Sequence, residues 1–330
     1  MSESEARRRR VLVTGAAGYL GKLTVAALAE RGADLGLVVA LDVTEVPEDR
    51  RLAGVVYARA SVCDAGLDAL LREHAIDTVV HLAAIVRPPV KGGVELARRV
   101  DVEGTRNVLE ACVSTGVSRL IVTTSGAAYG YHADNPAWLR ENDPLRGNTD
   151  LPYSHHKRLV EEMLADYRAR HPSLAQLVFR PGTIVGDTVQ SPVTDLFERP
   201  VVLGVAGSDS PFVFIWDADV VACLVRGVFG PEAGIYNLAG DGALTPRQIA
   251  RRLGKPYLPV PAPVLRAALA VLHAIGKSPF GPEQVAFLRH RPVLSNTRLK
   301  RDFGYVPKKT SSEAFELYRA ARSRSANPPR

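Results

Sequence analysis

Short apolar runs alternate with helix-length amphipathic segments over the first 180 residues. Strands are predicted at 11–14, 35–42, 54–60, 78–84, 118–125 and 175–181. Helices are predicted between them, at 20–31, 65–74, 94–114 and 152–170. Alternation at this spacing is typical of βαβ crossovers, which join parallel strands. The pattern therefore predicts an α/β fold with a doubly wound parallel sheet, covered by helices on both faces.

Beyond residue 180 the pattern loosens, and Pro and Gly become frequent. A helix is predicted at 217–229, a strand at 234–240 and a helix at 245–253. The apolar run 262–276 is too short to span a bilayer and contains charged or polar residues, so we expect a packed helix or a lid over an apolar pocket. We divide the chain into two parts. Residues 1–180, with a basic tail at 1–10, form the sheet domain, and residues 181–330 form a smaller mixed region. Within the second part, a segment at about 211–240 is expected to return to the sheet.

A glycine-rich turn follows the first strand directly and opens the first helix. Gly15, Gly18 and Gly21 stand three residues apart. The first allows a tight turn, the second lets backbone approach a pyrophosphate, and the third lets the helix pack on the sheet. The N–H groups and dipole of the helix then hold the anion. This context favours a dinucleotide site in a Rossmann-type sheet over a turn without a ligand.

The second predicted strand ends at Asp42, roughly 20 residues after the glycines, where a carboxylate accepts from both hydroxyls of an adenosine ribose. The same carboxylate repels a 2′-phosphate, which favours NAD over NADP. Arg50 and Arg51 lie close enough in sequence to keep NADP open, since a nearby arginine accommodates that phosphate.

Two chemistry-bearing residues lie four positions apart at the start of the helix after the fifth strand. Tyr153 and Lys157 share one helix face. An ammonium group beside a phenol stabilises the phenolate and makes tyrosine a usable acid or base near neutral pH. The chain repeats this spacing at Tyr305 and Lys309, but Pro307 prevents a helix from aligning that pair. We therefore favour the first pair as catalytic.

Ser125 closes the fifth predicted strand, at the edge where parallel sheets present ligand sites. Its hydroxyl could hydrogen-bond a reacting oxygen. It could equally cap the end of the strand, and spacing leaves both interpretations open.

Composition narrows the class of protein. The 330 residues are 46% hydrophobic and 23% charged, which excludes a disordered or fibrous chain. Cys63, Cys112 and Cys223 lie far apart, which excludes a disulfide framework and fits a reducing compartment. No His, Cys, Asp or Glu cluster has metal-ligand spacing, so we predict no metal. His81, in a buried strand, is predicted to be a hydrogen-bonded core residue.

The formal net charge of +7 includes Arg7–Arg10 in the N-terminal tail. Neither end interleaves aromatic residues or carries a recognition motif, so we expect a solvated basic surface and no nucleic-acid partner. The start resembles a signal peptide, but Thr14, the glycines and Lys22 interrupt its apolar stretch. We expect a soluble, cytoplasmic protein without a membrane anchor.

A set of motifs follows in a fixed order. They are TGAAGYLG (14–21), HLAA (81–84), DVEGTRNVLEA (101–111), TTSGAAYG (123–130), YSHHK (153–157), FRPGTIVG (179–186) and NTRLKRDFGYVPKKT (296–310). Together they resemble the extended short-chain dehydrogenases/reductases, in their NAD-dependent epimerase/dehydratase branch. The resemblance covers nearly the whole chain, and the ordered set is far more specific than any single motif.

The resemblance implies NAD as the cofactor and gives the residues roles. Tyr153 matches the general acid/base, Lys157 the residue that bonds the nicotinamide ribose and tunes Tyr153, and Ser125 the serine that orients the substrate oxygen. Asp64 matches the residue near the adenine amine. Cofactor contacts are implied at Gly15, Ala17, Gly18, Tyr19, Leu20, Gly21, Asp42, Asp64, Leu82, Ala83, Ala84, Tyr153, Lys157 and Pro181. Substrate contacts are expected from Ser125, Thr183 and Trp216, although core packing is the commoner fate of such an aromatic residue.

Three positions depart from the family pattern. Asp101 stands where asparagine is usual, and either alters a water relay or is a change on the helix surface. Thr183 replaces the asparagine of nucleotide-sugar enzymes, and Phe212 replaces an arginine that meets the phosphates. Losing both groups suggests a substrate without a diphosphate, because an unpaired buried phosphate is costly.

We therefore expect an NAD-dependent dehydrogenase or ketoreductase that moves a hydride between nicotinamide and a secondary alcohol or ketone. The alternative is a nucleotide-sugar epimerase or dehydratase with retained NAD. A third interpretation, a non-catalytic NAD(H)-sensing protein, fits less well because the Tyr–Lys pair is present.

Apolar residues on the helices 94–114 and 153–170 spread wider than one core face needs; they are Leu159, Val160, Met163, Leu164 and Tyr167. In resembling proteins these two helices pair across a two-fold axis. We predict a homodimer.

Overall fold

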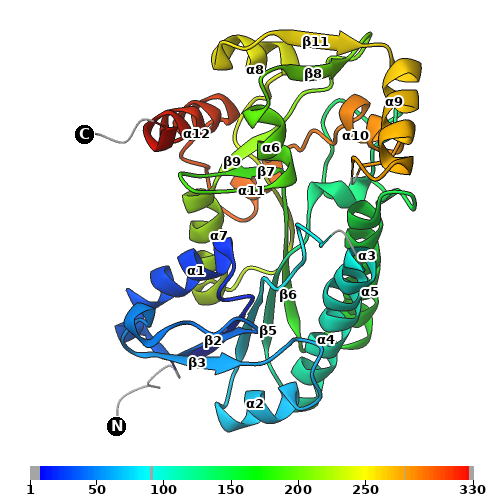
Figure 1. The fold of residues 1–330 in the computed structure, drawn as a ribbon. Helices are drawn as coiled ribbons and strands as arrows, with labels where there is room; N and C mark the ends of the chain where they lie inside the picture. The colour runs from blue at the N-terminus through cyan, green and yellow to red at the C-terminus, as the bar shows by residue number, and fades with distance from the viewer. Residues whose placement is uncertain (1–7, 90–91, 279, 327–330) are drawn as a thin grey trace, which may run out of the picture.

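A computed structural model describes residues 8–89, 92–278 and 280–326; of the basic tail 1–10, residues 1–7, including Arg7, therefore lie outside the described residues. The centre is a seven-stranded sheet in the order β10-β6-β5-β4-β1-β2-β3, and every pairing in it is parallel (Figure 1). Its strands are β1 (Arg9–Thr14), β2 (Leu35–Asp42), β3 (Val55–Arg59), β4 (Thr78–His81), β5 (Arg119–Thr123), β6 (Ala175–Pro181) and β10 (Gly234–Leu238). The order reverses between β1 and β4, which is where such sheets bind ligands at their carboxyl ends. The predicted Rossmann-like α/β fold is confirmed.

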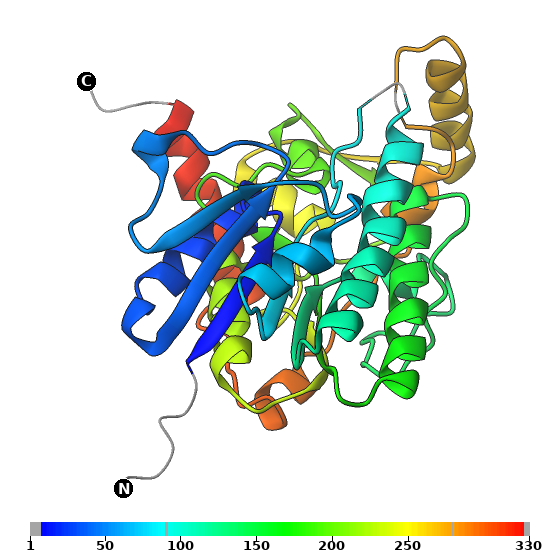
Figure 2. The same ribbon diagram turned by 90° about the horizontal axis from the view of Figure 1, so that it is seen from below.

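Helices cover both faces of the sheet (Figure 2). One face packs against α1 (Tyr19–Ala29), α7 (Asp217–Phe229) and α11 (Thr297–Arg301), and the other against α2 (Leu67–Glu73), α4 (Gly104–Thr115) and α5 (Pro152–Arg170). Within β1, Val11 and Val13 pack on the face covered by α1, α7 and α11, and Leu12 packs on the opposite face. Neighbouring side chains of a strand point to opposite faces of the sheet.

The predicted helix 94–114 is found as three consecutive segments. These are α3 (Gly93–Arg98), a π-helical turn (Arg99–Glu103) and α4. A π turn inserts an extra residue into a helix and is frequent at functional sites. Here it contains Asp101.

The smaller region has two short sheets of its own. Strand β7 (Thr183–Val185) pairs with β9 (Phe214–Trp216), and β8 (Val202–Val205) pairs with β11 (Tyr257–Val260). The helices here are α6 (Pro192–Glu198), α8 (Pro246–Leu253), α9 (Ala262–Ala274), α10 (Gln284–Arg289) and α12 (Ser311–Ala326). Helix α8 begins at a capping box of Thr245 and Gln248, which confirms the helix predicted there.

Helix α9 does not pack as expected. Leu265 is its one buried side chain among the described residues, whereas Val264, Val271 and Ile275 at the end of the helix are 58–60% exposed. The helix lies at the edge of the molecule in both views (Figures 1 and 2). No helix in the described part of the chain is long and apolar enough to cross a membrane.

The residues used to predict a dimer have another role. Val160, Met163, Leu164 and Tyr167 are all buried within the single chain, in the core under α5. Leu159, the fifth, is half-buried and packs against the same core. The homodimer stays a prediction that rests on the resemblance.

Candidate active site

The glycine turn makes a close-packed cradle at the carboxyl end of β1. Gly15 has φ +69°, and a Cβ there would lie 2.7 Å from the Ala83 backbone nitrogen. A Cβ on Gly21 would lie 2.0 Å from the Gly15 carbonyl oxygen. Gly18 is the N-cap residue of α1, whose first N–H groups point into the turn. These two glycines therefore let the turn pack tightly on the backbone around it, and a turn without side chains at a helix N-terminus fits the pyrophosphate of a dinucleotide.

Tyr19 links this turn to the smaller region. Its hydroxyl donates to Asp217 Oδ2 at 2.5 Å, at the start of α7. Burial raises the pKa of Tyr19, and its hydrogen bond to Asp217 adds to this, so the phenol is a neutral donor. A Cβ on Gly186 would collide with both groups, which explains a glycine there. Ala17 and Leu20 lie half-buried beside Tyr19.

Asp42 is fixed beside the glycine turn by two backbone bonds. Its Oδ2 accepts from Ala17 N at 2.9 Å, and its Oδ1 accepts from Thr44 N at 2.8 Å. Each oxygen keeps a further lone pair for the two ribose hydroxyls expected there.

Replacing Asp42 by alanine should lower NAD affinity about 10- to 100-fold and narrow the preference over NADP, because hydrogen bonds to a charged group are worth about 1.5–3 kcal/mol. Titration calorimetry of nucleotide-free protein with each dinucleotide measures both effects. Glu48→Gln, on the exposed turn that follows, is the control. Unchanged NAD affinity in the alanine variant would show that Asp42 does not contact the ribose.

The other predicted cofactor residues line the same edge of the sheet. Leu82, Ala83 and Ala84 follow β4 and are half-buried, and Pro181 ends β6. Asp64 is exposed, and its Oδ2 accepts from Ser61 N at 2.7 Å, which fixes the turn after β3.

The three predicted catalytic residues lie at the carboxyl end of β5 and the start of α5. Ser125 is the N-cap residue of a 3₁₀ turn (Gly126–Tyr129), where its Oγ accepts from Ala127 N at 3.1 Å. The capping interpretation is therefore correct, and the hydroxyl hydrogen is left to donate. Lys157 Nζ lies 5.5 Å from the centroid of the Tyr153 ring, on one face of α5 as predicted. Tyr153 is half-buried, and Lys157 is buried.

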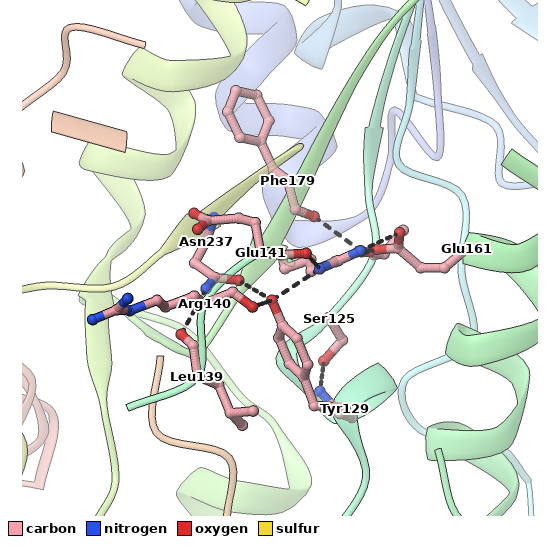
Figure 3. Close-up of polar contacts among 11 residues, drawn as sticks. Ser125, Tyr129, Leu139, Arg140, Glu141, Glu161, Phe179 and Asn237 are labelled. Carbon is pink, nitrogen blue, oxygen red and sulfur yellow. Dashed lines mark hydrogen bonds and ion pairs between the residues drawn. The ribbon is translucent and has the colours of Figure 1, made fainter. Parts of the chain in front are cut away.

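A buried polar network holds the framework behind Ser125 (Figure 3). Arg180 on β6 pairs with both oxygens of Glu161 on α5, at 2.8 and 2.9 Å. Glu161 also accepts from the Thr124 hydroxyl at 2.6 Å. Arg180 donates to the Tyr129 hydroxyl at 2.8 Å, which donates to Asn237 Oδ1 on β10 at 2.9 Å. The network thus ties three strand ends to α5 and to the turn that Ser125 caps.

Histidine 81 is the core residue that the sequence predicts. The Nδ1 atom of His81 bonds the Thr14 hydroxyl at 2.8 Å, and its Nε2 bonds the Thr105 hydroxyl at 3.0 Å. Burial, with the charge of Lys157 adding to it, lowers the pKa of His81 to about 3. Among the described residues no group of three or more His, Cys, Asp or Glu side chains could hold a metal ion.

Asp101 is 1% exposed and lies beside Lys157, so the interpretation as a change on the helix surface is wrong. The spacing of the motif gave no sign that Asp101 is buried, because its burial depends on the π turn in which it lies.

On the substrate side, Thr183 is half-buried on β7, and Trp216 ends β9 against an aromatic core. Phe212 is buried in that core. The guanidinium of Arg291 lies 3.7 Å from the centroid of the Phe212 ring. An arginine therefore lies against the ring at position 212, and a separation of 79 positions hid this contact from pattern reasoning.

Arg291 also faces Tyr131, which sequence reasoning missed. Burial is the main cause of the raised pKa of Tyr131, and the charges of Tyr153 and Arg291 act on it in opposite directions. Tyr131 is therefore close enough to both Tyr153 and Arg291 for their charges to act on it. The ring of Phe287 packs edge-on against Tyr131, with centroids 5.3 Å apart.

Comparison with known proteins identifies the family of this chain. The profile of the NAD-dependent epimerase/dehydratase family matches residues 11–200. An uncharacterized protein of Mycobacterium tuberculosis is 27% identical over 311 residues, covering 93% of this chain and 82% of its own length. The NAD complex of the Thermus thermophilus UDP-glucose 4-epimerase is 26% identical, with a TM-score of 0.70 over 94% of this chain and 98% of that one. MoeE5 in complex with UDP-glucuronic acid and NAD is 21% identical, with a TM-score of 0.73 over 96% and 99%, and shows the fold.

The family assignment explains the glycine cradle. Residues 11–200 are more than half of the chain, and they include the turn, Asp42, Ser125, Tyr153 and Lys157. This chain belongs to the NAD-dependent epimerase/dehydratase family of extended short-chain dehydrogenases/reductases, and it is an NAD-dependent enzyme.

Proposed function

We propose that the enzyme acts on a nucleotide sugar, as an epimerase or dehydratase that keeps its NAD bound. This was the alternative to a dehydrogenase of secondary alcohols. The observation that carries it is Arg291. An arginine at the Phe212 ring removes one of the two departures that argued against a diphosphate substrate, and Thr183 remains the other.

Arg291 is a buried cation without a counter-ion. It is 8% exposed, and Nη1 donates to the Ser210 carbonyl at 2.5 Å. Its Nε has no partner, and no ion pair joins it to a carboxylate within the described part of the chain. Burial lowers the pKa of Arg291 to about 9. An unpaired buried charge is costly, so a site of this kind is completed by an anion, and a phosphate suits the planar guanidinium.

The reaction needs a proton and a hydride to leave the same carbinol. The phenolate of Tyr153 takes the hydroxyl proton, Ser125 donates a hydrogen bond to the oxygen, and the charge of Lys157 favours the phenolate. NAD, when bound, would supply the group that takes up the hydride and gives it back. In an epimerase the hydride then returns to the opposite face of the same carbon and Tyr153 returns the proton to its oxygen, which inverts the centre. In a dehydratase water leaves from two neighbouring carbons while the carbonyl is kept, and the hydride and a proton add across the double bond that this elimination forms.

Cofactor retention separates this proposal from its competitor. Denatured, purified protein should release near-stoichiometric NAD, identified by mass spectrometry against protein concentration. Incubation with UDP-glucose, UDP-galactose or UDP-glucuronic acid should then give an isomer or a dehydrated product by liquid chromatography and mass spectrometry. An empty protein that binds NADH reversibly and reduces ketones would instead support the dehydrogenase.

Arg291→Gln should weaken binding of UDP alone about 10- to 100-fold, because a charge-assisted bond to phosphate is worth about 1.5–3 kcal/mol. Calorimetry with UDP measures this without turnover. Arg266→Gln, on the exposed part of α9, removes the same charge from the surface and should leave the affinity unchanged. Equal UDP affinity in both variants and the unmodified protein would remove the main support for a nucleotide substrate.

A further inference from the structure

A buried carboxylate faces the lysine of the catalytic pair. Asp101 Oδ2 lies 3.8 Å from Lys157 Nζ, and the two side chains are 0% and 6% exposed. Asp101 Oδ1 accepts from Ile85 N at 2.9 Å. Its Oδ2 has no hydrogen-bond partner among the described residues. One oxygen is therefore fixed to backbone, and the other faces the ammonium group.

The backbone around Asp101 is also held in place. The Thr105 hydroxyl donates to the Asp101 carbonyl at 2.6 Å and bonds His81 Nε2. Ile85 directly follows the segment Leu82–Ala84 at the sheet edge. The carboxylate therefore joins the loop after β4, the π turn and α5, and cannot easily move away from Lys157.

Among the charged groups around this pair, Asp101 is the one that balances the positive charge of Lys157. The titratable and charged groups that face it are Tyr153, His155, His156 and Lys157 on α5, Arg98 on α3 and His81 on β4. Burial lowers the pKa of His81 and that of His156, so both are neutral at pH 7. Arg98 is paired with the exposed Glu103.

We propose that Asp101 is a positioning residue that acts on Tyr153 through Lys157. Its carboxylate holds the ammonium group and offsets part of the positive charge that favours the Tyr153 phenolate. The amide of an asparagine would keep the bond to Ile85 N but would lack this charge. The proposal rests on the acid/base role of Tyr153 in the proposed function.

Asp101→Asn isolates the charge. Tyrosinate absorbance near 295 nm is titrated with NAD present, and the curve of the matching Tyr153→Phe protein is subtracted, so that Tyr153 ionisation is seen without any substrate. Loss of a negative charge beside Lys157 favours the phenolate. The midpoint for Tyr153 should therefore fall by about one pH unit. Glu95→Gln neutralises an exposed carboxylate on α3 and should leave the midpoint in place.

An unchanged midpoint in Asp101→Asn would overturn the proposal, since the charge would then have no effect on Tyr153. Asp101→Ser is a second uncharged variant and should move the midpoint in the same direction. Loss of folding in both variants would make Asp101 a structural residue and would also defeat the proposal. None of these readings depends on the substrate, so a wrong substrate class would leave the titration unaffected.

Discussion

Tyr153→Phe should lower kcat about 10²- to 10⁴-fold, the usual contribution of a positioned acid or base. The phenyl ring keeps the packing at the start of α5 and removes the one group there that can exchange the substrate proton. Lys157 and Ser125 cannot replace it, because the Lys157 ammonium group is held beside Asp101 and the Ser125 hydroxyl, although free to donate a hydrogen bond, is too weak an acid to give up its proton near neutral pH. Product formation from a converted nucleotide sugar gives the rate, and retained NAD with an unchanged Tm shows that the site is intact.

The chain provides its own control for this experiment. Tyr305 and Lys309 have the spacing of the catalytic pair but lie outside any helix, and the Tyr305 hydroxyl donates to Asp219 at 2.7 Å. Tyr305→Phe should therefore reduce stability slightly and leave kcat near that of the unmodified enzyme. Unchanged turnover in Tyr153→Phe itself would exclude Tyr153 as the acid/base and bring back a non-catalytic, NAD(H)-sensing function.

Glu161→Leu should destabilise the fold by about 3–5 kcal/mol, because it leaves the Arg180 guanidinium buried without its partner. Both side chains of this ion pair are at most 3% exposed, so water cannot replace the lost carboxylate. The Thr124 hydroxyl loses its acceptor at the same time. The midpoint of urea unfolding, followed by circular dichroism, measures the loss.

A double-mutant cycle separates the ion pair from simple loss of packing. Arg180→Met combined with Glu161→Leu removes both charges and should recover much of the stability lost by Glu161→Leu. Glu162→Leu alters the exposed partner of Arg158 one position along α5 and should change stability by less than about 1 kcal/mol. If Glu161→Leu unfolds at the same urea concentration as the unmodified protein, the network does not hold the sheet ends together.

Elements with strong local signals were predicted closely. Helix 152–170 and strand 175–181 are found with the predicted bounds, since Pro152 can start a helix and an unbroken apolar run marks a buried strand. The short strands β7 and β9 were not predicted, because three residues carry no period and their pairing is tertiary. The run at 262–276 does form a helix, but composition could not show that its apolar side chains face solvent.

The candidate site also combines local patterns, which the sequence reveals, with contacts between distant residues, which it does not. The glycine turn and the Tyr153–Lys157 pair are local patterns, so sequence sufficed to find them. The approach of Arg291 to Phe212 and that of Asp101 to Lys157 join residues far apart in the chain, and no local period encodes either contact. The substrate inference drawn from Phe212 therefore took no account of Arg291, which lies against that ring.

The strand order has a consequence for synthesis of the chain. One face of the sheet is closed by α7, by β10 at its edge and by Leu299 and Phe303, all of them made after residue 216. A nascent chain that has emerged only to β6 therefore carries the glycine turn and most of the strands, but α1 covers only part of that apolar face. Such a face is prone to aggregation until the later segments cover it. The cofactor-binding half is thus expected to mature only when the ribosome has nearly finished the protein.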